Sequence, residues 1–82
     1  MYYVYLLKSD KTQKLYIGST PDLRRRVDEH NAGKSQSTKS GIPWQVLYYE
    51  AFPAKRLALE RERKLKRYGR GIVALKQRLG LR

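Results

Sequence analysis

An unbroken apolar run at the start of the chain constrains its fold more than any other feature. Tyr2–Leu7 reads YYVYLL, and a polar turn segment, Ser9–Thr12, follows after Lys8. A strand that is apolar at nearly every position is largely buried on both faces, so we expect one over Tyr2–Lys8. A second strand is expected over Lys14–Ser19, which reads KLYIGS. The two runs lie too close together for a crossover connection, and they therefore predict an antiparallel hairpin.

Residues that favour the start of a helix follow the predicted hairpin directly. Thr20 is a favourable N-cap residue, Pro21 suits the first helical position, and Asp22 suits the positive end of the helix dipole. The helix is expected to cover residues 23–30. It should end near Gly33, because glycine readily adopts the left-handed conformation that terminates helices.

The rest of the chain alternates between loop, strand and helix. Lys34–Pro43 is polar and basic and is expected to form a mobile loop. A third strand is predicted over Trp44–Phe52, a second helix over Ala54–Tyr68 and a short third helix over Ile72–Leu79. The order β-β-α-β-α-α predicts the α+β class, with a small three-stranded antiparallel sheet flanked by helices. At this length we expect a single domain over residues 1–82.

The charge balance points to a polyanionic partner. The chain has 19 lysines and arginines against 7 aspartates and glutamates, which gives a formal net charge of +12. Such an excess on a small surface attracts polyanions, and nucleic acid is the first candidate. A basic protein that only stays soluble, or one associated with the ribosome, would have the same composition.

The absence of cysteine and the single histidine restrict the chemistry. No cysteine is present, which excludes disulfides, thiolate zinc sites and cysteine nucleophiles. His30 alone cannot form a multi-histidine cluster, so any metal is expected to be a hard ion such as magnesium with oxygen ligands. No stretch reaches the roughly 20 apolar residues that span a bilayer, and no basic segment precedes the apolar start. We expect a soluble cytoplasmic protein with no membrane partner.

The predicted hairpin brings two tyrosines together. If the turn is centred between Asp10 and Lys11, Tyr5 lies directly opposite Tyr16, and opposite residues project from the same face. Such a pair can stabilise a sheet as a cross-strand aromatic contact, or it can belong to a functional site. A register slip of one residue would separate the two rings.

The first helix has an apolar stripe with a basic flank. At about 100° per residue, Leu23 and Val27 face the core and Arg25 points away from it. Arg26 lies on a flank of the stripe, and His30 follows one turn later on the same flank. The pair can be part of a functional site, or it can be an amphipathic boundary from which both side chains reach water.

The second helix carries a carboxylate at the edge of its apolar stripe. Glu62 lies beside the stripe, whereas Glu60 points well away from it and Arg61 falls within it. A carboxylate near a buried edge can hold a metal ion, or it can pair with Arg61 or Arg26. The stripe consists of Ala54, Leu57, Ala58, Leu65 and Tyr68.

The spacing of these residues resembles that of a known family. Tyr3-Val4-Tyr5, ten further residues and then Tyr16-Ile17-Gly18 resemble the paired motifs of the GIY-YIG endonucleases. The same signature has an arginine ten residues after the tyrosine of its second motif and a histidine four residues later. Arg26 and His30 resemble this part of the signature. The resemblance covers nearly the whole chain and is closest to the small stand-alone bacterial branch.

A later segment extends the resemblance. Residues 58–66, ALERERKLK, resemble the family helix A-x-x-R-E-x-x-L-K, with Glu62 at the metal-binding position. Two positions depart from the pattern. Tyr3 replaces the glycine of the first motif, and the asparagine that many family nucleases carry in a later segment has no counterpart, since Asn31 lies elsewhere.

The resemblance implies a metal-dependent endonuclease that hydrolyses phosphodiester bonds in DNA. Glu62 would hold Mg²⁺ or Mn²⁺, and Arg26 would contact the scissile phosphate. One tyrosine would position or deprotonate the attacking water with help from His30, and the choice between the two stays open. The implied catalytic residues are Tyr5, Tyr16, Arg26, His30 and Glu62.

Further phosphate contacts are expected from the basic residues of the loop and the second helix. Such contacts position nucleic acid without reading bases, so we expect recognition of DNA structure, in repair or recombination, with RNA as an open alternative. The candidates are Lys34, Lys39, Arg61, Arg63, Lys64, Lys66, Arg67 and Arg70.

Two other functions fit the same sequence. A nucleic-acid-binding module could retain the fold and the basic surface without turnover. A structural or partner-binding subunit could leave the choice of target to another chain. The presence of all five implied catalytic residues favours the nuclease.

Overall fold

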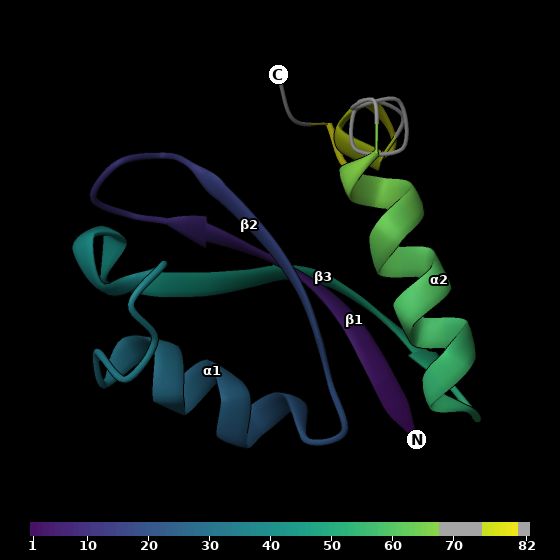
Figure 1. Cartoon of the computed structure of the whole chain (residues 1–82). Coiled ribbons are helices and arrows are strands. Elements are labelled where there is room, and N and C mark those ends of the chain that lie inside the picture. Colours follow the sequence, from purple (N-terminus) through teal and green to yellow (C-terminus); the bar gives the residue numbers. More distant parts are fainter. Residues whose placement is uncertain (68–74, 81–82) are drawn as a thin grey trace.

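The computed structural model describes residues 1–67 and 75–80 and shows an α+β fold (Figure 1). Its elements, in chain order, are β1 (Tyr2–Ser9), β2 (Leu15–Thr20), α1 (Leu23–Asn31), the short 3-10 helix η1 (Lys39–Gly41), β3 (Trp44–Phe52) and α2 (Lys55–Lys66). Residues 75–78 are also helical. The start of the predicted Ile72–Leu79 helix and the predicted end of the second helix at Tyr68 lie outside the described residues. The predicted fold class is confirmed. Within the described part, no helix is long and apolar enough to cross a membrane.

The sheet has three antiparallel strands in the order β2-β1-β3. Val4 and Leu6 of the central strand pack in a core that α2 completes, whereas Tyr5 and Leu7 pack in a second core that α1 completes. Neighbouring side chains of a strand point to opposite faces, so the two helices cover opposite faces of the sheet. All four residues are at most 2% exposed, which confirms that this strand is buried on both faces.

The register of the hairpin differs from the predicted one by two residues. Tyr5 pairs with Gly18, and it is Leu7 that lies opposite Tyr16. The chain turns over residues 10–14, because the first strand continues one residue further than expected. A shift of two residues preserves the face, so the two tyrosine rings lie diagonally, with their centroids 6.3 Å apart.

The N-cap of α1 also differs from the prediction. The residue that caps the helix is Asp22, whose carboxylate accepts a hydrogen bond from the backbone N–H of Arg25. Thr20 is not the cap, because it still pairs with Tyr3 in the sheet, and its hydroxyl accepts from the N–H of Asp22. The predicted helix end is confirmed, since Gly33 has a φ of +76°.

The polar segment between α1 and β3 is anchored to the core. Thr38 is completely buried, and its carbonyl accepts a hydrogen bond from the indole N–H of Trp44 at 2.8 Å. Gly41 is also buried, and its carbonyl accepts from the hydroxyl of Ser9. The predicted loop is therefore tied to the sheet, because two side chains from the sheet bind its backbone.

Candidate active site

The candidate site is built around Tyr5, which β1 places against the neighbouring strand β2. The side chain is 2% exposed, and its ring lies directly over Gly18. A Cβ atom at position 18 would lie 2.6 Å from the ring carbon Cζ of Tyr5, far inside van der Waals contact. The glycine of the second motif is therefore required because the phenol occupies the space of a side chain.

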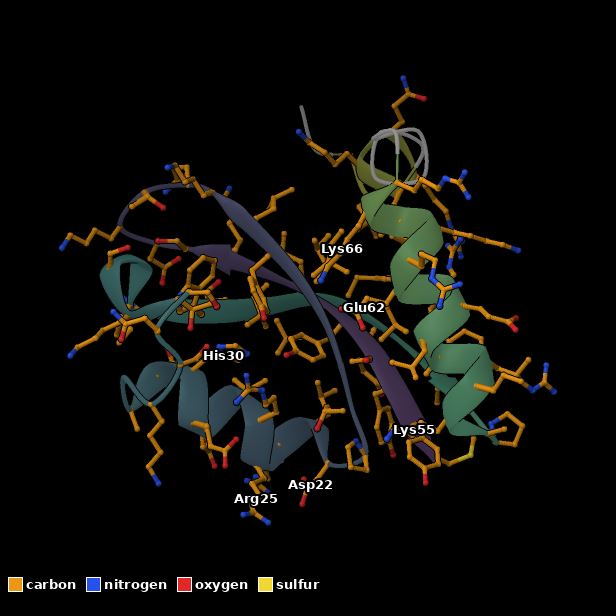
Figure 2. All side chains as sticks on the ribbon, in the orientation of Figure 1. Asp22, Arg25, His30, Lys55, Glu62 and Lys66 are labelled. Atoms are coloured by element: carbon orange, nitrogen blue, oxygen red, sulfur yellow. The ribbon has the colours of Figure 1, made fainter. Side chains whose placement is uncertain are left out.

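His30 joins this phenol from α1, from a position on the sheet side of the helix (Figure 2). Its Nε2 lies 3.0 Å from the hydroxyl oxygen of Tyr5, and its Nδ1 lies 2.7 Å from Oγ1 of Thr38. The edge of the imidazole packs near Tyr16, with the ring centroids 5.0 Å apart. His30 is completely buried, so the alternative of a side chain that reaches water from an amphipathic boundary is wrong for this residue.

The imidazole is neutral at physiological pH. Burial lowers the pKa of His30, and the positive charge of Arg26 lowers it further, against a smaller opposite effect of Glu29. A buried histidine with both ring nitrogens in hydrogen bonds can orient its neighbours without carrying a charge.

Acidification is therefore expected to destabilise the protein through His30. The unfolded chain binds a proton near the ordinary pKa of 6.5, whereas the folded chain resists protonation, so stability is full above pH 6.5 and falls below it. The pKa values of Glu29, Glu50 and Glu62 are lowered from 4.5, so protonation of these groups reduces stability only at lower pH. Urea unfolding between about pH 7.5 and about pH 5 should show a falling free energy of unfolding.

The matched variant for this measurement is His30→Gln, which keeps a polar side chain but has no titrating group. Its free energy of unfolding should be lower than that of the wild type at pH 7.5 and nearly constant over the same range. A wild-type profile that is equally flat would show that protonation of His30 does not change the free energy of unfolding.

Arg26, on the flank of α1, lies beside the hydroxyl of Tyr5. Its side chain is 33% exposed, and Nη1 donates to Oε1 of Glu29 at 3.1 Å. Burial and the neighbouring Tyr16 raise the pKa of Tyr5 to about 12, although a hydrogen bond from Arg26 acts in the opposite direction. Tyr5 therefore keeps its proton at neutral pH, with the guanidinium beside its hydroxyl. The prediction that Arg25 points away from the core is confirmed, since its side chain is 77% exposed.

Glu62 approaches from α2 and points toward the sheet, with Lys66 beside it (Figure 2). Oε1 accepts a hydrogen bond from the hydroxyl of Ser19 at 2.6 Å, and Oε2 accepts from Nζ of Lys66 at 2.7 Å. Burial acts to raise the pKa of Glu62, but the hydrogen bonds from Lys66 and Ser19 outweigh it and lower the pKa. The carboxylate is therefore ionised at neutral pH, in a partly buried position where the side chain is 19% exposed.

The two arginines that could have paired with Glu62 have other partners. Nε of Arg61 lies 2.7 Å from Oε1 of Glu50 on β3, and Arg26 binds Glu29. The interpretation of Glu62 as the partner of an arginine is therefore wrong. Its cationic neighbour is a lysine on its own helix, which is 51% exposed and can swing away into solvent.

The edge strand β2 lies between the two parts of the site. Gly18 pairs with Tyr5 and faces α1, whereas the next residue, Ser19, faces α2 and binds Glu62. The structure thus brings Tyr5, Tyr16, Arg26 and His30 together on one face and places Glu62 across this strand. The charge of Glu62 still reaches Tyr5, whose pKa it helps to raise.

A single carboxylate limits the kind of metal that the site could hold. The described residues contain no group of three or more histidine, cysteine, aspartate or glutamate side chains that could form a metal cage. Mg²⁺ is commonly bound by one or two carboxylates, with water and phosphate oxygens as the other ligands. Glu62 therefore fits a magnesium or manganese ion that is completed by a phosphate, and does not fit a structural zinc or calcium site.

Comparison with known proteins identifies the family of this chain. Residues 1–71 match the model of the GIY-YIG catalytic domain. The chain belongs to the GIY-YIG family. The resemblance inferred from the sequence is thereby confirmed, and it includes both tyrosine motifs and the helix with Glu62.

The relatives of this GIY-YIG chain include small proteins and a larger nuclease subunit. A UPF0213 protein of Haloquadratum walsbyi is 40% identical over 70 residues, which cover 84% of this chain and 78% of the relative. A UPF0213 protein of Streptococcus pyogenes is 45% identical over 62 residues, which cover 73% of this chain and 65% of the relative. The structure-specific endonuclease subunit slx1 of Schizosaccharomyces pombe is 48% identical over 69 residues, which cover 74% of this chain and 25% of the subunit.

A solved structure shares the fold of this GIY-YIG domain. The solution NMR structure of the UPF0213 protein BH0048 from Bacillus halodurans matches with a TM-score of 0.52 at 32% identity. The match covers 93% of this chain and 86% of that one. The arrangement of helices and strands is therefore found in another UPF0213 protein.

The predicted phosphate-binding residues differ in how available they are. Arg61 and Lys66 are held in ion pairs with Glu50 and Glu62. Arg70 lies outside the described residues. Lys34 and Lys39 beside α1 and Arg63 and Lys64 at the end of α2 have exposed side chains. Arg67 is also exposed but has a contact within the protein.

Sequence reasoning missed two residues of this GIY-YIG site. Ser19 follows the second motif directly, and a hydroxyl on the strand face toward the second helix could have suggested a partner for Glu62. Thr38 gives no such signal, because its burial against His30 depends on how the polar segment returns to the sheet.

Proposed function

We propose that this protein is a metal-dependent endonuclease that hydrolyses phosphodiester bonds in DNA and selects DNA by structure rather than by sequence. The observation that best supports it is the buried Tyr5–His30 pair with Arg26 beside it and an ionised carboxylate, Glu62, across one strand. Membership of the GIY-YIG family supports the same reaction, and one relative is named as a structure-specific endonuclease subunit. DNA repair or recombination would use such an activity.

Arg26 is the group that would bind the scissile phosphate. Its guanidinium is held by Glu29, is partly exposed and lies at the hydroxyl of Tyr5. A guanidinium can form paired hydrogen bonds to phosphate oxygens and stabilises the negative charge that increases during attack by water. The ion pair with Glu29 orients this side chain before the substrate arrives.

The two tyrosines would have different tasks. Tyr5 keeps its proton, since its pKa is raised to about 12, and it would donate a hydrogen bond to the phosphate. Tyr16 is only partly buried and packs against the imidazole of His30, so it is the more exposed of the two tyrosines. We assign the positioning of the attacking water to Tyr16, with His30 orienting both rings.

Glu62 would hold the divalent ion. Ser19 orients its carboxylate. The ammonium group of Lys66 would leave Oε2, and this exposed side chain would turn toward solvent or DNA. A bound Mg²⁺ or Mn²⁺ would supply positive charge at the phosphate and at the leaving oxygen. The exposed lysines and arginines beside α1 and at the end of α2 would hold the flanking DNA through its phosphates.

A second candidate is a DNA-binding module without turnover. The pairing of Glu62 with Lys66 favours it, because the ammonium group already neutralises the carboxylate that a metal would need. In that case the basic surface would bind DNA, and the centre would be a structural remnant.

Cleavage assays on defined DNA structures test the proposal. Labelled single-stranded, duplex, flapped and branched DNAs of shared sequence are incubated with purified protein and Mg²⁺, Mn²⁺ or a chelator. We expect metal-dependent cleavage of a branched or flapped DNA. Arg26→Ala should reduce its rate about 100-fold to 1,000-fold, because a charge-stabilising donor at the phosphate is lost.

The control variant is Arg24→Ala, which removes the same charge from an exposed position on the same helix. It should retain most of the activity. Salt-sensitive binding without cleavage of any DNA under either ion would establish the binding module instead. Cleavage that Arg26→Ala leaves unchanged would place the active site elsewhere.

A further inference from the structure

We propose that Thr38 is a positioning residue whose hydroxyl fixes the tautomer of His30 and thereby leaves the hydroxyl proton of Tyr5 free for the substrate. Its consequence for cleavage rests on the proposed nuclease function. Its structural part concerns only the placement of protons in the folded chain, and it can be tested without any substrate.

Three buried groups form a continuous hydrogen-bonded line. Oγ1 of Thr38 lies 2.7 Å from Nδ1 of His30, and Nε2 of the same ring lies 3.0 Å from the hydroxyl oxygen of Tyr5. Thr38 and His30 are completely buried, and Tyr5 is 2% exposed. Both hydrogen bonds have donor–acceptor distances within the usual range.

The line contains one more proton than it has internal acceptors. A neutral imidazole carries one N–H, and each of the two hydroxyls carries one O–H, whereas the line holds only two hydrogen bonds. One proton must therefore point outward at one of the two ends. The direction of both hydrogen bonds depends on which end this is.

The Thr38 end has no acceptor for that proton. Within the described part of the chain, Nδ1 of His30 is the one hydrogen-bond partner of this hydroxyl. The residue is completely buried, so bulk water does not reach it either. A buried hydroxyl whose proton has no acceptor is strongly disfavoured. The two ends differ here, because Thr38 is fully enclosed, whereas the hydroxyl of Tyr5 lies beside Arg26, whose side chain is 33% exposed and gives water or a phosphate a route to it. The hydroxyl of Thr38 therefore donates to Nδ1.

The outward proton therefore lies at the Tyr5 end. With Nδ1 as an acceptor, the imidazole carries its proton on Nε2 and donates it to the oxygen of Tyr5. The guanidinium of Arg26 also lies beside this oxygen. The phenol then has its own proton free to donate to a phosphate oxygen of the substrate. In the opposite tautomer the phenol would donate to the histidine instead and would not be available.

Thr38 is held in place by its backbone, so the hydroxyl is preorganised. Its carbonyl accepts from the indole N–H of Trp44 at 2.8 Å and from the backbone N–H of Gly41 at 3.1 Å. Gly41 in turn packs so closely against the indole that a Cβ atom there would lie 2.5 Å from its Cζ2. The polar segment is thus fixed at the residue that faces the imidazole.

Imidazole ¹⁵N NMR tests the tautomer directly, and the chain has a single histidine, so its signals need no assignment. The folded wild type at neutral pH is expected to show a protonated Nε2 and an unprotonated Nδ1. Thr38→Val, which has nearly the same shape but no hydroxyl, should give a mixture of the two tautomers. Thr38→Ser should restore the wild-type signals. A protonated Nδ1 in the wild type would overturn the proposal.

The cleavage rate provides the second measurement. Thr38→Val should lower the rate about 10-fold to 100-fold with DNA binding unchanged, a loss of the size seen when the partner that orients a metal-ligating histidine is removed. Thr38→Ser should recover most of it, and Ser37→Ala, an exposed hydroxyl of the same segment, should have no effect. An unchanged rate in Thr38→Val would contradict the proposed role.

The outcomes separate this inference from the proposed function. If the wild type cleaves no DNA, the nuclease proposal fails, and the NMR result alone decides whether Thr38 sets the tautomer. If Thr38→Val does not fold, the wild-type and Thr38→Ser spectra still decide it, because the position of the proton in the wild type is the quantity in question.

Discussion

Replacing Glu62 with glutamine is expected to abolish DNA cleavage while the fold and DNA binding are retained. Glutamine has the same shape and can still accept the hydrogen bond from Ser19, so α2 should keep its place on the sheet. It lacks the negative charge that a divalent ion needs, and Lys66 loses its partner. The loss of metal-assisted charge stabilisation corresponds to a rate decrease of about 1,000-fold or more.

The experiment compares single-turnover cleavage rates with and without metal, and DNA affinity by fluorescence anisotropy. Glu60→Gln is the matched control, since Glu60 lies on the same helix, is 49% exposed and forms a surface ion pair with Arg56. It should cleave at the wild-type rate. Metal-dependent cleavage that persists in Glu62→Gln would show that the ion is held by other ligands, and the assignment of this carboxylate would be wrong.

Replacing Gly18 with alanine is expected to damage both stability and activity. The added Cβ would overlap the ring of Tyr5, at 2.6 Å from Cζ, and the ring is fixed by its contacts with His30 and Tyr16. Overpacking of this kind costs about 1–3 kcal/mol. Cleavage should also fall, because relief of the overlap moves the hydroxyl of Tyr5 away from its partners.

A double-mutant cycle identifies the cause. In the background of Tyr5→Ala the same substitution at position 18 should cost little, because the overlapping ring is absent. Urea unfolding of the wild type, both single variants and the double variant gives the coupling energy between the two positions. A cost that is equal in both backgrounds would show that the glycine is needed for the backbone and not for the phenol.

Local signals predicted most of the fold. The apolar run of β1, the proline and acidic residues before α1 and Gly33 after it are short-range features, and the elements that they predict are present. The hairpin register was wrong, because it depends on a turn that residues 10–14 form. The helix cap was wrong for a similar reason, since pairing of Thr20 in the sheet moved the cap to Asp22.

The candidate site was predictable to a lesser degree. Strand pairing placed the two tyrosines together and helix periodicity placed Arg26 beside His30, whereas only the family resemblance joined the two pairs. The structure brings all four residues together, and their catalytic roles stay predictions. The partners that orient them were not predictable. Thr38 and Ser19 reach His30 and Glu62 through contacts that join different elements of the fold, and no periodicity within one element reports such a contact.

The central position of β1 has a consequence for how the site responds to thermal fluctuations. Its amide groups bond to both neighbouring strands, and its side chains are divided between the two cores, so it can open only when both layers separate. Tyr5 therefore belongs to the part of the molecule that opens last. Glu62, in contrast, is carried by a helix on one face of the sheet, whose opening separates only one of the two cores. Local opening can thus displace Glu62, whereas Tyr5 stays in place for as long as the protein is folded.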